Sequence, residues 1–153
     1  NNLLENTKET KLVNYLILIP LSISLILFPP DSRADPTFWQ DLYKKNGLYF
    51  EKSVDKPFNG YVTGSQEGML INGKKDGLWS GFYENGNLLW KGEYKEGKII
   101  SWKEFHSNGE IFVTGDYKNG EKNGVWLIFD KKGTLIAKEL FDNGKIIDTT
   151  IIK

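Results

Sequence analysis

The chain has 153 residues, with 20 basic and 20 acidic side chains and no cysteine. This length fits one domain, and the balanced charge argues against the basic stripe by which proteins capture nucleic acid. Without cysteine there are no disulfide bonds, and no lipid is attached through a cysteine.

Residues 1–34 have the composition of a secretory signal peptide. A polar stretch with lysines precedes an almost wholly apolar run at 12–28, and small residues then flank Arg33 ahead of a cleavage site after Ala34. The segment therefore predicts export to the periplasm or the outside of the cell. An uncleaved anchor formed by 12–28 is the alternative, although this run is at the lower limit for a membrane span.

The next two segments lead into the repeats. Residues 35–41 are interpreted as a linker or cap that carries Trp39. Residues 42–72 predict a degenerate leading repeat, with strands at 48–50 and 58–62. A repeat array needs an atypical terminal unit whose outer face tolerates water, and this segment fits that role.

Residues 73–153 contain one unit written three times, followed by an apolar terminal strand. The unit has a period of 23 or 24 residues, which is typical of a repeat architecture. Its turn glycines are Gly73, Gly86, Gly97, Gly109, Gly120, Gly133 and Gly144.

Five of the seven turns are Asn-Gly pairs, which suit the two positive φ angles of a type I′ hairpin turn. The runs between them are rich in aromatic and β-branched residues, as in half-buried strands. We therefore predict an all-β protein, an elongated antiparallel β-meander of 23–24-residue hairpin repeats. No stretch between the glycines is long enough for a stable helix.

Aromatic residues at fixed places in the unit form what we call the aromatic ladder. Its members are Trp79, Phe82, Trp102, Phe105, Trp126 and Phe129. The three indoles are expected in a row on one face, roughly 9.6 Å apart. Each phenylalanine follows its tryptophan by three positions, so it lies on the opposite face unless a bulge reverses it. The ladder either holds the units together or contacts a ligand. If Trp102 is fully buried, its loss should cost about 3–5 kcal/mol.

The sequence contains no recognisable catalytic constellation, and we expect no enzyme activity, cofactor or metal site. His106 is the only histidine, and Tyr83 and Asp130 occupy its place in the other units, so it is interpreted as variable surface. Two stretches, 68–74 and 92–98, approach a phosphate-binding loop but lack its Ser or Thr and its helix. They are interpreted as turn glycines beside surface lysines.

The unit beginning Gly73-KKD-Gly77-L-Trp79-SG-Phe82 resembles the MORN-repeat variant of bacterial proteins, including the group named YwqK-like antitoxins. The resemblance covers about residues 41–147, although Ser101 replaces the glycine found at Gly77. It implies elongated hairpins that contact proteins or lipids, with no catalytic residues to carry over.

Three functions are compatible with these features. The leading hypothesis is a non-enzymatic module that binds an unidentified protein partner at the cell envelope, in the manner of an antitoxin or immunity protein. A second is binding of a cell-wall polymer or carbohydrate through the aromatic ladder. A third is binding to a membrane surface, which the neutral charge does not favour.

Overall fold

The structure, a computed structural model, describes residues 36–152, and the signal peptide or anchor predicted for residues 1–34 lies outside them. The described part is almost entirely β-structure. Its elements are β1 (Thr37–Phe38), the 3₁₀ turn η1 (Trp39–Asp41), β2 (Leu42–Lys45), β3 (Leu48–Glu51), β4 (Gly60–Thr63), β5 (Gln66–Ile71), β6 (Lys74–Phe82), β7 (Leu88–Lys95), β8 (Lys98–Phe105), β9 (Ile111–Lys118), β10 (Glu121–Phe129), β11 (Leu135–Asp142) and β12 (Lys145–Ile151).

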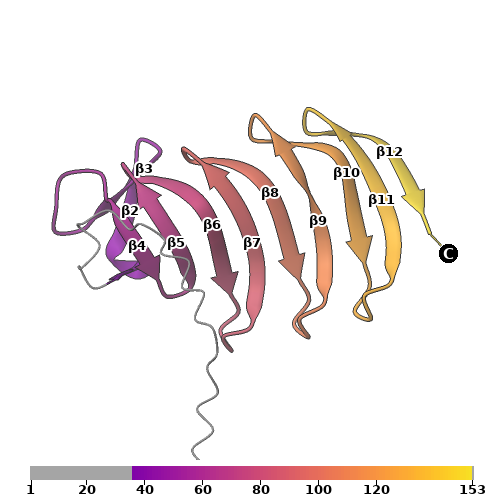
Figure 1. Ribbon diagram of the computed structural model, residues 1–153, viewed down its shortest axis with the longest axis horizontal. Helices are drawn as coiled ribbons and strands as arrows, with labels where there is room; N and C mark the ends of the chain where they lie inside the picture. The colour runs from indigo at the N-terminus through magenta and orange to yellow at the C-terminus, as the bar shows by residue number, and fades with distance from the viewer. Residues whose placement is uncertain (1–35, 153) are drawn as a thin grey trace, which may run out of the picture.

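Ten strands form one long sheet in the order β1-β4-β5-β6-β7-β8-β9-β10-β11-β12. From β4 onward each strand pairs antiparallel with its neighbour in sequence, and only β1 pairs in parallel. Figure 1 shows the resulting curved ribbon, with hairpin turns along an upper and a lower rim. The predicted antiparallel meander of hairpins is confirmed.

The turns of the upper rim have the predicted type I′ geometry. Asn72 and Gly73 both have positive φ, 49° and 71°. The same pair of positive angles occurs at Asn46-Gly47, Glu96-Gly97, Asn119-Gly120 and Asn143-Gly144. Glu96 adopts this conformation without being asparagine, and its backbone N–H donates to the Asp76 carboxylate at 2.9 Å.

On the lower rim, the prediction of type I′ turns from the Asn-Gly pairs is wrong. In the β6–β7 loop only Gly86 has positive φ, and the loop closes through hydrogen bonds between Tyr83 and Asn87 and between Gly86 and Tyr83. The Asn85 side chain accepts a hydrogen bond from the backbone N–H of Asn87 at 3.0 Å. Such Asx turns compete with type I′ turns, and the loop at 108–109 repeats the arrangement.

The third loop of the lower rim has an aspartate in the same role. The Asp130 carboxylate accepts hydrogen bonds from the backbone N–H groups of Thr134 and Lys132, at 2.9 and 2.8 Å. These two bonds hold the pKa of Asp130 below its ordinary value. All three lower loops are therefore organised by a side-chain oxygen rather than by two left-handed residues.

Among residues 36–152, a second layer covers only the first repeat. The hairpin of β2 and β3 forms its own two-stranded sheet and joins the long sheet through the hydrogen bond from Tyr49 N–H to Gly73 O, 2.8 Å. The buried cluster between the hairpin and the long sheet consists of Leu42, Val62, Leu70 and Trp79. This packing encloses the face of the sheet that carries the first indole.

Candidate functional site

The three indoles of the aromatic ladder lie on one face of the sheet. Gly92 on β7 pairs with Trp79 on one side and with Trp102 on the other, and Trp102 also pairs with Gly115. Trp126 in turn covers Gly115. We call this the indole face and the opposite side the outer face.

Trp79 and Trp126 are structural members of the ladder. Each is only 1% exposed. Each indole N–H donates to a backbone carbonyl of the preceding strand, Trp79 to Met69 at 3.0 Å and Trp126 to Asp116 at 3.2 Å. Register shifts with left-handed glycines precede both rings on their strands. In this conformation the two indoles are closed to any ligand.

Trp102 is not equivalent to the other two. It is half-buried and stacks on Trp90, with ring centroids 4.8 Å apart and an interplanar angle of 18°. Its unit is one residue shorter and has Ser101 where the others have glycine, so the register shift there leaves Ile100 as the extra residue. The loss of about 3–5 kcal/mol in stability was expected only if Trp102 is fully buried. Because the ring is half-buried, that condition is not met.

A register shift occurs at each phenylalanine of the ladder. Of the two alternatives that the three-residue spacing allowed, the opposite face or a bulge, a bulge is therefore present. The shifts fall at Phe82, Phe105 and Phe129, and all three rings are half-buried. The register shift is therefore a feature that all three units of this chain repeat.

The interpretation of the His106 position as variable surface is wrong. His106 Nε2 donates to the carbonyl of Phe129 at 3.0 Å, and the Tyr83 hydroxyl donates to the carbonyl of Phe105 at 2.9 Å. Both side chains are half-buried and connect one lower loop to the next. Tyr83 and His106 therefore have the same structural role although they are different residue types. Each carries a hydrogen-bond donor at the end of a planar ring.

Lys75 lies in an enclosure of aromatic rings on the indole face. Its Nζ is 4.2 Å from the ring centre of Trp79, 4.9 Å from that of Trp90 and 5.2 Å from that of Tyr94. It also donates to Gln66 Oε1 at 2.7 Å. Lys75 is therefore half-buried, whereas Lys74 and Lys98, the lysines of the stretches 68–74 and 92–98, are exposed as the sequence predicts.

The enclosure changes the acidity of this lysine. Burial, followed by the positive charge of Lys44, lowers the pKa of Lys75 from 10.5 to about 8. Burial also raises the pKa of Tyr49 and of Tyr94, so both hydroxyls stay protonated at neutral pH. Lys44 reaches the same place from β2, with its Nζ 5.3 Å from the ring centre of Tyr49.

The lowered pKa of Lys75 should make the free energy of unfolding increase as the pH rises above about 8. The unfolded Lys75 holds its proton up to about its ordinary pKa of 10.5, whereas the folded one releases it near 8. Between these values the unfolded state binds more protons, so deprotonation favours the folded state. Urea unfolding near pH 7 and again near pH 9.5 should show a gain in stability that is smaller in Lys75→Met. An equal gain in both proteins would contradict the shift.

The outer face carries a periodic set of exposed aliphatic residues, which we call the outer row. Its members are Leu78, Ile100, Val125 and Ile147, which are 76%, 39%, 54% and 61% exposed. One comes from each of β6, β8, β10 and β12, and each lies at or beside a register shift. Leu78 pairs with Glu93, and Val125 pairs with Leu140, on the side away from the indoles.

The sequence carries a signal for the position of Lys75 and a signal for the outer row. A lysine stands two residues after the turn glycine in the first and third units, at Lys75 and Lys122. An aliphatic residue stands immediately before the tryptophan in the same two units. Neither signal shows which side chains of the leading hairpin, such as Lys44, come to lie beside the repeats.

Within residues 36–152, no group of three or more His, Cys, Asp or Glu side chains is placed to hold a metal ion. The same described residues contain no helix that is long and apolar enough to cross a membrane.

An open antiparallel sheet built from successive hairpins of one unit defines a β-hairpin repeat protein. The sequence profile of the MORN repeat variant matches residues 75–96 and 100–119, so the first two units are MORN repeats of this variant. Residues 120–144 continue the same strand pattern beyond the matched ranges. A search among curated proteins finds no match, and neither does a search among solved structures. MORN repeats are generally associated with binding to proteins or membrane lipids.

Proposed function

We propose that this chain is a non-enzymatic binding module whose outer face docks a protein partner. The observation that carries the proposal is the outer row. Single exposed aliphatic side chains are normal on protein surfaces. A series that recurs on every second strand is different, because it presents an apolar line to any partner that runs across the strands.

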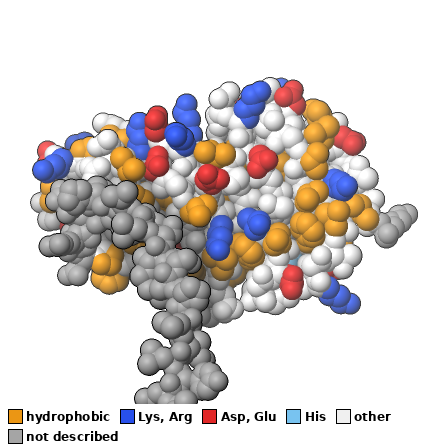
Figure 2. All heavy atoms as spheres, in the orientation of Figure 1, with side chains coloured by type: hydrophobic (Ala, Val, Ile, Leu, Met, Phe, Trp, Pro, Cys, Tyr) orange, Lys and Arg blue, Asp and Glu red, His pale blue; other side chains and the backbone are white. Residues whose placement is uncertain are grey.

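The dimensions and chemistry of the outer row suit a protein segment. Four members on alternate strands extend over about 29 Å, given roughly 4.8 Å between neighbouring strands. Figure 2 shows one face of the molecule, on which hydrophobic side chains gather in a band over the C-terminal half of the sheet between charges of both signs. The chain as a whole has 20 basic and 20 acidic side chains. Apolar contact therefore supplies the main attraction to a partner.

The two alternatives have less support. A wall polymer would stack on exposed rings, but Trp79 and Trp126 are each 1% exposed and Trp102 is half-buried. Anionic membrane surfaces attract basic patches, and the balanced charge provides no general attraction of this kind.

We place the proposed interaction at the cell envelope because residues 1–34 have the pattern of a secretory signal. The resemblance to antitoxin proteins adds a toxin as one candidate class of protein partner. Sequencing the N-terminus of protein recovered from the envelope tests the location. An N-terminus at residue 35 supports export, whereas an intact segment in a cytoplasmic fraction contradicts it.

The outer row is tested by comparing two double variants in pull-downs from envelope extract. Leu78→Ser with Val125→Ser should lose a partner that the wild-type chain retains at high salt, since apolar contacts are little screened. Lys91→Ser with Lys138→Ser should keep it, because these exposed lysines lie on the same face. Both pairs should fold, as exposed substitutions usually change stability by less than about 0.5 kcal/mol.

Parallel sedimentation with peptidoglycan and with liposomes distinguishes the alternatives. Equal recovery of the partner by both double variants would contradict docking on the outer row. Sedimentation with wall polymer that Trp102→Ala abolishes in a folded protein would instead support the carbohydrate hypothesis.

A further inference from the structure

A small open pocket lies where the leading hairpin meets the upper rim of the first repeat. Its volume is about 190 Å³. It is lined by Lys44, Gly47, Tyr49, Lys74, Lys75, Tyr94 and Gly97. Among these described residues there are lysines and tyrosines but no carboxylate.

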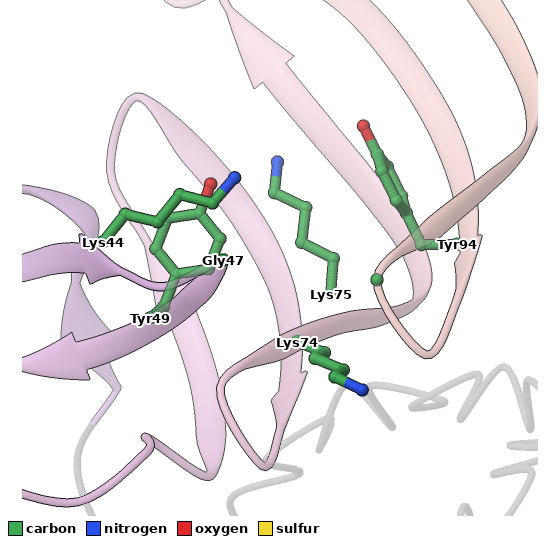
Figure 3. Close-up of a pocket in the computed structure, with 7 residues that line it drawn as sticks. Lys44, Gly47, Tyr49, Lys74, Lys75 and Tyr94 are labelled. Atoms are coloured by element: carbon green, nitrogen blue, oxygen red, sulfur yellow. The ribbon is translucent and has the colours of Figure 1, made fainter. Parts of the chain in front are cut away.

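Four polar side-chain tips face the same side of this pocket. Figure 3 shows the amines of Lys44 and Lys75 and the hydroxyls of Tyr49 and Tyr94 directed to one opening, whereas Lys74 points away from them. The two amines come from different layers, the leading hairpin and β6. They belong to residues 31 positions apart, so the fold and not the local sequence brings them together.

The Lys75 amine is held in place before any ligand arrives. The Gln66 amide oxygen accepts from Lys75 Nζ at 2.7 Å, and the Trp79 ring centre lies 4.2 Å from that nitrogen. No carboxylate raises the pKa of Lys75, while the charge of Lys44 lowers it. Two like charges in one partly desolvated pocket repel each other, and a bound anion would relieve that repulsion.

The third repeat provides an internal comparison. Lys122 lies over Trp126 and Phe141, with its Nζ 4.0 and 4.9 Å from their ring centres. The lysine over an indole is therefore a repeated structural element that covers the ladder. What distinguishes the first repeat is the second amine and the tyrosine hydroxyl that the leading hairpin adds.

We propose that this pocket is a binding site for a phosphate group, either inorganic phosphate or a phosphate monoester. A phosphate monoester approaches a charge of −2 at neutral pH and offers three acceptor oxygens. Two ammonium groups match that charge, and the ammonium and hydroxyl protons match those oxygens. A monocarboxylate would neutralise only one of the two amines.

Calorimetric titration of the 153-residue chain with inorganic phosphate and with glycerol 3-phosphate, at constant ionic strength, tests the site. We expect saturable binding at one site. Lys44→Met should weaken it by about tenfold or more, since hydrogen bonds to charged groups typically contribute at least this much. Lys44 is exposed, so this variant should fold. Tyr94→Phe, which removes only a hydroxyl, should weaken binding several-fold and provides a second test.

Lys122→Met is the matched control, because it removes the same kind of amine from over an indole. It should leave phosphate affinity unchanged. Affinity that is equal in wild-type, Lys44→Met and Tyr94→Phe proteins, or no saturable binding at all, would overturn the proposal. So would acetate binding as tightly as phosphate with the same dependence on Lys44.

Vesicles separate the two sources of the phosphate group. Phosphatidylcholine vesicles with and without phosphatidic acid are compared in sedimentation, using the wild-type, Lys44→Met and Lys122→Met chains. Binding that requires phosphatidic acid and Lys44 assigns the site to a lipid headgroup. Binding of the soluble phosphates alone assigns it to a free ligand.

Discussion

Replacing Trp126 by alanine should lower the free energy of unfolding by about 3–5 kcal/mol, the usual cost of truncating a large buried ring. The ring is 1% exposed and lies between Tyr117 and Phe141, at centroid distances of 5.3 and 5.8 Å. Its N–H donates to Asp116 O, so the substitution also removes a donor from that carbonyl. Urea unfolding followed by circular dichroism measures the change.

Trp102→Ala is the comparison that makes this prediction specific. This ring is half-buried and makes its aromatic contact with Trp90, so it should cost clearly less than Trp126→Ala. If the two substitutions destabilise the protein equally, the buried indoles have no special role. If Trp126→Ala leaves the unfolding midpoint unchanged, the ring is not part of the core.

The strand order and the hairpin repeat could be predicted because they depend on local signals. Glycines at a fixed period and alternating apolar residues define strands and turns without reference to distant parts of the chain. The upper turns at Asn72 and Asn119 follow directly, since asparagine and glycine tolerate positive φ. The lower turns do not, because the Asn85 side chain bonds to the backbone instead.

The candidate sites could not be predicted because they depend on contacts between distant segments. Nothing near Lys75 in the sequence indicates that Lys44 will share its pocket. The difference between Trp102 and its two counterparts also arises in three dimensions, although its causes, one missing residue and Ser101 in place of glycine, were visible in the sequence. A shortened unit changes the register, and the register decides how deeply the ring is buried.

The structure explains why one position of the unit, five residues before the turn glycine, is itself a glycine. Gly68, Gly92 and Gly115 each stand five residues before a turn glycine, and each lies under the indole of the following strand. The fourth unit-equivalent position is Glu139, which pairs with Thr149 on β12. Glycine is thus found where an indole covers the strand, and a charged residue is found where no indole follows.

Gly115→Ala should therefore be among the most destabilising substitutions that add a single methyl group. A Cβ at this position would lie 2.4 Å from Trp126 Cδ2, and 2.5 Å from two further atoms of the indole. The fully buried, hydrogen-bonded ring has little freedom to move away. We expect a loss at or above the upper end of the roughly 1–3 kcal/mol that overpacking costs.

Gly109→Ala is the matched control, because a Cβ there would have no atom within 4 Å. Its φ of 91° makes alanine unfavourable by about 1–2 kcal/mol through backbone strain alone. Thermal or urea unfolding of the two variants under the same conditions should show the larger loss for Gly115→Ala.

A double-mutant cycle then identifies the cause. If the methyl group collides with the indole, Gly115→Ala should cost much less in a Trp126→Ala background, because the ring that it would meet has been removed. Additive losses would mean that alanine is disfavoured at this position for another reason. Strong coupling would establish that the glycine is required because it leaves room for the indole. The repeated glycine and the tryptophan of the following strand would then form one structural unit in each hairpin.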